Sequence, residues 1–200
     1  GASWWNPSPE PNAPAPKVFS WPTLTFALAG YGLFGVGYIG YMTFVVALLR
    51  EQGQSESALM VFYALLGCAV VLSSRLWSGL LNGARAGGAM ATLNALLGLA
   101  TIVPALTAAS SAVMASGLLF GAVFLSVVAS STALVRHNLP ASQWATGISA
   151  FTIVFATGQI IGPVVVGWIS DGPGGLARGL VFSSGALLLG AALAWRQKPL

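Results

Sequence analysis

Charged residues are scarce in this sequence of 200 residues. Lysine and arginine together number 8 and aspartate and glutamate 4, so 6% of the chain is charged, whereas a soluble domain carries about 25%. Because 56% of the residues are hydrophobic and the mean hydropathy is +0.82, the chain has too few polar side chains to cover a surface that faces water. This shortage excludes a soluble enzyme and a disordered chain. The few cations are scattered, so a nucleic-acid partner is excluded too. We expect an integral membrane protein, with the lipid bilayer as its surroundings.

Residues that could do covalent or metal chemistry are equally few. Cys68 is the only cysteine, which excludes an internal disulfide and a cage of thiolate ligands around a metal. His137 is the only histidine, and it stands in a polar break beside an arginine. The sequence contains no nucleophile–base pair, metal-ligand set or convincing phosphate loop. We therefore expect neither enzymatic activity nor a metal or other cofactor.

Long apolar runs fill the sequence from residue 24 onward. A helix needs roughly 17–25 apolar residues to cross the hydrocarbon core, and the last run reaches that length if its helix begins near Leu176. The runs lack the alternation of membrane β-strands, and the breaks between them are short and polar. We therefore predict an all-α polytopic membrane protein with six transmembrane helices. The runs are Leu24–Leu49, Ala58–Leu81, Ala89–Leu106, Ala112–Val135, Ala145–Ile169 and Leu180–Trp195.

The remaining residues suggest how the chain is divided and oriented. Residues 1–23 are rich in proline and are expected to form a linker or extramembrane segment, 24–195 the membrane domain, and 196–200 a cytoplasmic tail. The side that receives both termini also receives most cations, and short cytoplasmic loops are enriched in Lys and Arg. Both termini are therefore expected in the cytoplasm. The cations on that side are Lys17, Arg85, Arg136, Arg196 and Lys198, against Arg50 and Arg178 on the other.

A short internal repeat links the two halves of the sequence. The first run ends in Ala47–Arg50 and the fourth in Ala133–Arg136, and a polar turn and a serine follow each of them. The two copies are three helices apart, and each helix crosses the membrane once, so the second copy has the opposite orientation in the membrane. The pattern predicts two inverted three-helix repeats, the unit from which many secondary transporters are built.

Two of the runs resemble helices of the major facilitator superfamily of transporters. The fifth run contains Gly158–Pro163 and then Gly167–Asp171, a G-Q-x-x-G-P-x-x-x-G pattern that resembles the eleventh helix of that superfamily. The first run, at Tyr31–Tyr41, is similar to the seventh helix, in particular in the bacterial YbfB/YjiJ-like branch. The turn Gly79–Gly88, which contains Arg85, resembles the cytoplasmic loop motif without its acidic residue.

This resemblance covers about residues 24–195 and implies the C-terminal six helices of a twelve-helix transporter in a bacterial inner membrane. The proline-rich segment then takes the place of the central loop. The first, second, fourth and fifth helices should line a concave face, with the third and sixth peripheral. We expect that face to be covered by an N-terminal transporter half, a second copy or another membrane subunit.

Candidate substrate-binding residues lie on the first and fifth runs. Tyr31, Phe34, Tyr38 and Tyr41 are spaced so that they form one stripe along a helix. The stripe either faces a cavity or packs against a neighbouring helix. Thr152 and Gln159 share a face of the fifth run, and the amide of Gln159 forms either an interhelical hydrogen bond or part of a cavity. The candidates are Tyr31, Tyr38, Tyr41, Thr152 and Gln159.

Other residues are candidates for packing or conformational roles. Gly158 and Gly162 have the spacing that lets helix backbones approach closely in lipid, and Pro163 favours a kink. Arg75 is the only charge within a run. Its helix should continue to about Leu81 so that the side chain reaches the membrane surface, and anion binding is the alternative role. Arg85 belongs to the loop that resembles the cytoplasmic motif.

Together these features predict half of a secondary active transporter that moves a small solute by alternating access against a partner half. The alternative is a transporter-derived scaffold subunit, without transport activity, of a larger membrane complex. None of the runs contains Asp or Glu. If transport is coupled to protons, we expect the coupling carboxylate in the partner half.

Overall fold

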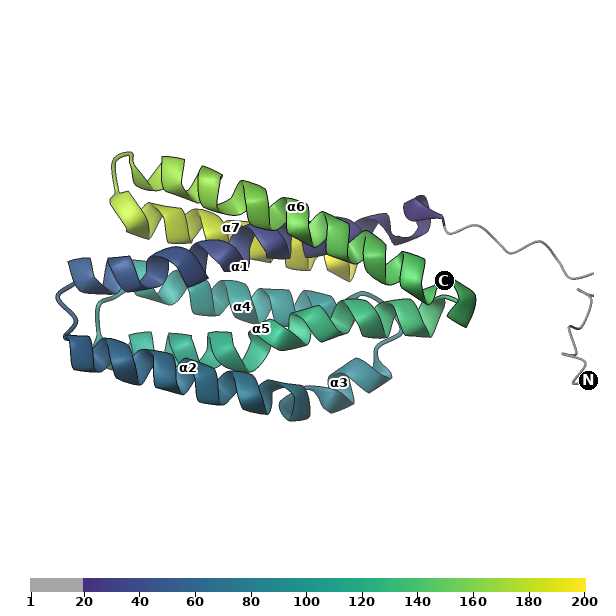
Figure 1. The fold of residues 1–200 in the computed structure, drawn as a ribbon, viewed down its shortest axis with the longest axis horizontal. Coiled ribbons are helices and arrows are strands. Elements are labelled where there is room, and N and C mark those ends of the chain that lie inside the picture. Colours follow the sequence, from purple (N-terminus) through teal and green to yellow (C-terminus); the bar gives the residue numbers. More distant parts are fainter. Residues whose placement is uncertain (1–19) are drawn as a thin grey trace, which may run out of the picture.

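The computed structural model describes residues 20–200, apart from the side chain of Ser74. Most of the expected linker, residues 1–19, therefore lies outside the described residues. The described part is all-helical, which confirms the predicted fold class, and the helices form one elongated bundle (Figure 1). The elements are η1 (Trp21–Leu24), α1 (Thr25–Glu51), α2 (Glu56–Leu76), α3 (Ser78–Gly83), α4 (Gly88–Leu106), α5 (Ser110–Asn138), η2 (Ala141–Gln143), α6 (Trp144–Ser170) and α7 (Gly175–Trp195).

The helices begin and end where the local sequence allows it. The side chain of Ser55 caps α2 by accepting a hydrogen bond from the backbone N–H of Ala58 at 3.2 Å. Gly53 and Gly174 have φ of 78° and 94° in the turns before α2 and α7. Glycine adopts such values without steric cost, so the chain can reverse within a few residues at both places.

The second span differs from the expected continuous helix. The span passes Arg75 and reaches Gly83, slightly beyond the expected Leu81, but it turns at Trp77 and resumes as the short α3, so it is not one continuous helix. Two interhelical hydrogen bonds lie at this break. The indole Nε1–H of Trp77 donates to the carbonyl of Ala122 at 2.8 Å, and Ser126 Oγ–H donates to the carbonyl of Ser73 at 3.2 Å. They attach the broken segment to α5.

Six helical segments are long and apolar enough to cross a membrane, α2 and α3 counting together as one. Helix α1 packs mainly against α6 and α7, α5 packs against α2 and α4, and α4 packs against α7. In Figure 1, α6, α1, α5 and α2 lie toward the viewer, with α4 and α7 behind them. Exchanging the first three spans for the last three converts α1–α6 into α5–α2 and α1–α7 into α5–α4, and leaves the α4–α7 pair as it is. The packing is therefore consistent with the predicted inverted repeat.

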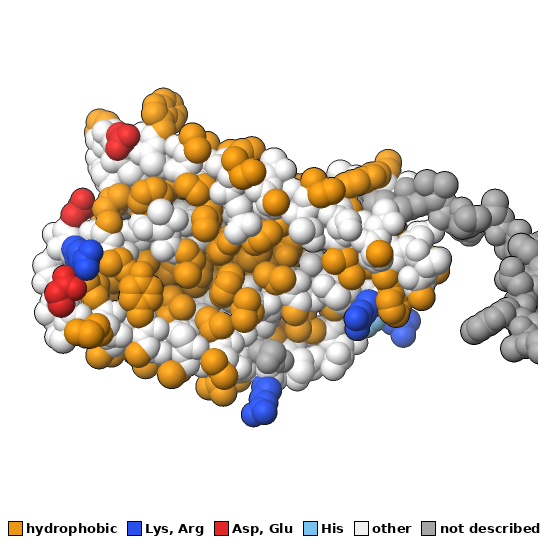
Figure 2. All heavy atoms as spheres, in the orientation of Figure 1, with side chains coloured by type: hydrophobic (Ala, Val, Ile, Leu, Met, Phe, Trp, Pro, Cys, Tyr) orange, Lys and Arg blue, Asp and Glu red, His pale blue; other side chains and the backbone are white. Residues whose placement is uncertain are grey.

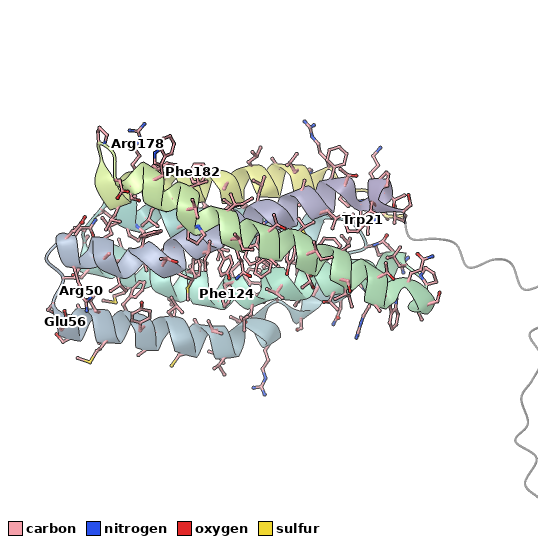
Figure 3. The ribbon with its side chains drawn as sticks, turned by 45° about the horizontal axis from the view of Figure 1, so that its top comes forward. Trp21, Arg50, Glu56, Phe124, Arg178 and Phe182 are labelled. Carbon is pink, nitrogen blue, oxygen red and sulfur yellow. The ribbon has the colours of Figure 1, made fainter. Side chains whose placement is uncertain are left out.

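The two ends of the bundle differ in charge. Arg50, Glu56 and Arg178 lie at one end, and Trp21 lies at the other (Figure 3). Arg50 Nε is 3.2 Å from Glu56 Oε1. The acidic side chains visible in Figure 2 all belong to the same end, and hydrophobic side chains cover the face between the ends. This distribution is the one expected for a membrane-spanning bundle.

Gln197 connects several helices at the end of the bundle where Trp21 and the C-terminus lie, and it is 4% exposed. Its Oε1 accepts a hydrogen bond from the N–H of Ala27 at 3.2 Å, and its Nε2–H donates to the carbonyl of Thr23 at 3.0 Å. The N–H of Gly87 donates to the Gln197 carbonyl at 3.1 Å. The segment expected as a tail thus connects the first turns of α1 and α4 to the end of α7.

Candidate functional site

The aromatic stripe of α1 is buried inside the bundle. The exposed fractions of Tyr31, Phe34, Tyr38 and Tyr41 are 3%, 0%, 7% and 0%. Because their spacing follows the helical period, all four rings point to the same side of α1. That side faces α5 and α6, so the stripe becomes the centre of a three-helix contact.

Phe155 of α6 joins most of this stripe into one cluster. Its ring centroid lies 5.3 Å from that of Tyr31, 5.3 Å from that of Phe34 and 5.5 Å from that of Tyr38. Phe124 of α5 stacks on the other side, 5.6 Å from Tyr38. Aromatic pairs at such distances stabilise their contact beyond simple burial of area. The rings therefore form a fixed platform at the contact of α1, α5 and α6.

The structure brings Tyr38 and Gln159 together at the edge of this cluster. Gln159 Nε2–H donates a hydrogen bond to the hydroxyl of Tyr38. Tyr38 is buried, whereas Gln159 is half-buried and reaches the surface of the bundle. Pro163 lies inside α6 and has no N–H, so the Gln159 carbonyl loses its helical hydrogen bond. A polar side chain and a carbonyl without its usual helical donor thus belong to the same residue.

Tyr41 lies deeper, away from this polar pair. Its hydroxyl is 2.7 Å from Ser116 Oγ, and Ser116 donates to the carbonyl of Ala100 at 2.7 Å. The ring of Phe120 stacks on Tyr41 with centroids 4.1 Å apart. From the sequence the stripe was expected either to face a cavity or to pack against a neighbouring helix. The structure shows packing: rings of α5 and α6 cover Tyr38, and rings of α5 and α2 lie against Tyr41.

The other predicted residues are separated from this pair. Thr152 is exposed on α6 and donates to the carbonyl of Ile148 at 2.9 Å. Tyr31 is buried, and its ring packs against Phe151 and Phe155 of α6. Arg75 and Arg85 are exposed, and the Arg85 carbonyl accepts a hydrogen bond from Asn138 Nδ2 at 2.9 Å.

Glycines of α6 hold that helix directly against α1. A Cβ added at Gly158 would lie 2.5 Å from the carbonyl oxygen of Gly32, and one added at Gly162 would lie 2.7 Å from that of Val36. Real Cβ atoms do not make contacts this short, so both positions require glycine at this helix separation. Because Gln159 follows Gly158 directly, this backbone contact brings its amide within reach of Tyr38.

Comparison with known proteins gives the same family as the sequence patterns. A family model described as "Uncharacterised MFS-type transporter YbfB" matches residues 4–195. The chain belongs to this family of the major facilitator superfamily. No curated protein and no solved structure matches it.

Several residues of the site in this YbfB-type transporter were not predicted from the sequence. Phe151 and Phe155 of α6 and Phe124 of α5 pack on the tyrosine stripe. The first two precede Gln159 by eight and four residues, so their helical spacing could have placed them on the Gln159 face. The described residues contain no group of three His, Cys, Asp or Glu side chains suited to a metal ion. The site is therefore made of aromatic rings, a tyrosine hydroxyl and an amide.

Proposed function

We propose that this chain is half of a secondary active transporter that moves a small solute by alternating access. The observation that carries the proposal is the hydrogen bond between Tyr38 and Gln159 at the edge of the aromatic cluster. An amide within a membrane span is costly to bury, and such polar groups commonly mark a substrate pathway. The half-buried position of Gln159 lets it exchange its tyrosine partner for a solute.

The exposed side of α6 supports a partner for this half. Thr152 and Thr157 are exposed there, whereas Ile160 and Val164 continue the same stripe with exposed fractions of 74% and 70%. Each threonine hydroxyl donates to a carbonyl of α6 at 2.9 Å, so this face is apolar apart from two hydroxyl oxygens that can still accept a hydrogen bond. We propose that a second six-helix half covers this face and supplies the carboxylate if transport is coupled to protons.

The orientation follows from the charges at the two ends. In the proposed arrangement, Arg85, Arg136, Arg196 and Lys198 face the cytoplasm together with both termini. The end formed by the α1–α2, α4–α5 and α6–α7 turns faces outward. We propose the bacterial inner membrane as the location, because the resemblance to the bacterial YbfB/YjiJ-like branch implies it.

The role of Gln159 can be tested without knowing the solute beforehand. Cells that produce the chain together with a six-helix partner should change their content of at least one small metabolite relative to cells without the chain. The change should disappear with Gln159→Leu at equal membrane abundance, because leucine cannot hydrogen-bond a solute.

Ile160→Leu is the matched control, since Ile160 is 74% exposed and the new leucine is also apolar. It should retain the metabolite change. The proposal would be contradicted by a change that persists in Gln159→Leu, or by the absence of any change in the unmodified pair.

A further inference from the structure

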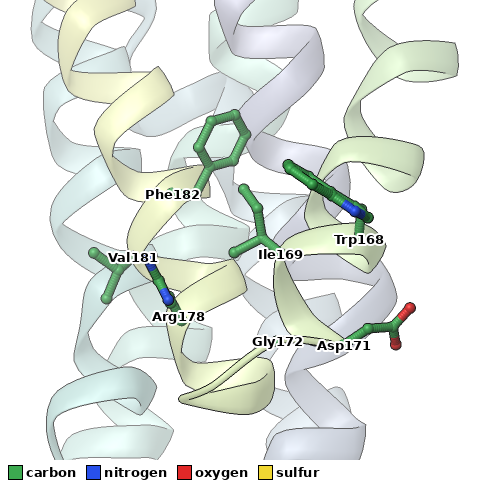
Figure 4. Close-up of a pocket in the computed structure, with 7 residues that line it drawn as sticks. All are labelled: Trp168, Ile169, Asp171, Gly172, Arg178, Val181 and Phe182. Carbon is green, nitrogen blue, oxygen red and sulfur yellow. The ribbon is translucent and has the colours of Figure 1, made fainter.

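A groove lies between the end of α6 and the beginning of α7, at the end of the bundle opposite Trp21 (Figure 3). Its volume is about 570 Å³, within the range of about 300–1,000 Å³ that is common for ligand sites. Figure 4 shows side chains from both helices around it. The lining residues are Trp168, Ile169, Asp171, Gly172, Arg178, Val181 and Phe182.

One part of the groove is apolar and open. Trp168 is 79% exposed and Val181 is 45% exposed, and Ile169 and Phe182 lie between them (Figure 4). These residues belong to the last turns of α6 and the first turns of α7, where the helices meet the polar turn. Tryptophan is enriched at this level of a membrane. The apolar wall therefore extends from the interface toward the hydrocarbon.

The groove also carries one charge of each sign, Asp171 on the α6 side and Arg178 on the α7 side (Figure 4). Asp171 follows α6 and Arg178 lies in the first turn of α7, and both side chains are exposed. Among the described residues the ion pair is Arg50–Glu56, and neither Asp171 nor Arg178 forms one. Arg178 Nη1–H donates to the carbonyl of Pro173 at 3.2 Å, which holds the side chain beside the turn. Its other N–H groups remain available to a ligand.

We propose that this groove binds a phospholipid whose headgroup carries a primary ammonium, of the phosphatidylethanolamine type. One acyl chain lies along the wall of Trp168, Val181 and Phe182. The phosphate accepts hydrogen bonds from Arg178, a geometry that the guanidinium favours. The ammonium donates to the carboxylate of Asp171.

The two charges select this headgroup over other common ones. An anionic phosphatidylglycerol gains the contact with Arg178 but is repelled by Asp171. Phosphatidylcholine carries both charges, but its quaternary ammonium has no N–H to donate to the carboxylate. This binding site is separate from the Tyr38–Gln159 pair, so it does not depend on the proposed transport function.

Native mass spectrometry of the delipidated chain can test the selectivity. The chain is mixed with equal amounts of dioleoyl phosphatidylethanolamine, phosphatidylcholine and phosphatidylglycerol. We expect phosphatidylethanolamine to be retained roughly five-fold more than the other two, the effect of about one charge-assisted hydrogen bond exposed to water. Asp171→Asn should abolish this preference, and Arg178→Gln should reduce retention of all three lipids.

Arg196→Gln removes the same charge at the opposite end and should leave lipid retention unchanged. A second pair of variants tests the groove itself. Val181→Trp should fill it and abolish the rise in melting temperature that added phosphatidylethanolamine causes, whereas Leu189→Trp should preserve that rise. Equal retention of phosphatidylglycerol and phosphatidylethanolamine would overturn the proposal, as would unchanged selectivity in Asp171→Asn or unchanged retention of all three lipids in Arg178→Gln.

Discussion

Gln159 lies where three properties of α6 meet. Its amide reaches Tyr38 of α1, its carbonyl is released by Pro163, and Gly158 beside it contacts the α1 backbone. From the sequence the amide was expected to form either an interhelical bond or part of a cavity. The structure contains the interhelical bond, and the half-buried position of Gln159 leaves one side of the amide open. The role of Tyr38 and Gln159 in substrate binding remains a prediction.

Removing the hydroxyl of Tyr38 should weaken the bundle. Tyr38→Phe leaves the Gln159 amide without its tyrosine partner, and interhelical hydrogen bonds in membranes contribute about 1 kcal/mol. We expect a lower melting temperature of the purified chain. Tyr63→Phe serves as the control, because Tyr63 is 47% exposed on α2 and should tolerate the change. Equal melting temperatures for the two variants would show that the Tyr38–Gln159 bond contributes nothing measurable.

At the scale of helices, the Tyr38–Gln159 pair depends on the close packing of α6 against α1. The sequence predicted that Gly158 and Gly162 permit close packing, but it could not identify the partner helix. The structure shows the carbonyls of Gly32 and Val36 of α1 opposite them. The break at Trp77 was not predicted, since the apolar run continues through it and the bonds that accompany it come from α5. Spacing along one helix contains no information about such a partner.

Gly158→Ala should separate α1 from α6. The new Cβ would lie 2.5 Å from the Gly32 carbonyl oxygen, a backbone atom that cannot move by itself. Overpacking of this kind costs about 1–3 kcal/mol, and the melting temperature should fall accordingly.

Gly167→Ala on the same helix is the matched control, because its Cβ would meet only Phe44, at 3.9 Å. It should leave the melting temperature nearly unchanged. A variant at Gly158 as stable as the one at Gly167 would contradict the close contact between α1 and α6.

For the whole molecule, charge is concentrated at the two ends of an apolar bundle. The beginning of α1 and the C-terminus share one end, where Gln197 and Gly87 join α7 to α4. The family match and the six candidate spans establish a membrane-embedded transporter. The direction in which this transporter is inserted is inferred from its cations alone. Insertion can therefore be tested independently of transport.

Cysteine labelling on intact cells should reveal the orientation. In a Cys68→Ser background, Ser57→Cys should react with a membrane-impermeant maleimide, whereas Ser142→Cys should react only after the cells are opened. Both serines are exposed, so access to the reagent depends on the side of the membrane. The reverse labelling pattern would overturn the cytoplasmic position of the termini.

The sequence by itself determined the class of this protein. A chain with 6% charged residues and six long apolar runs has no stable arrangement in water, and in lipid every backbone polar group must be satisfied within a helix or a closed barrel. The runs lack the alternation of polar and apolar residues that a barrel strand needs, so they form helices. The family pattern is also local, because its glycines, glutamine and proline lie within a single helix.

The tertiary structure decided which faces meet. Helical spacing placed Tyr31, Tyr38 and Tyr41 on one side of α1, but it could not show that α5 and α6 cover that side. Helical spacing also could not predict that Asp171 and Arg178 line one groove, because their placement depends on how the turn between α6 and α7 folds. Periodicity describes one helix at a time. Burial, hydrogen-bond partners and grooves arise only when helices distant in the sequence pack together.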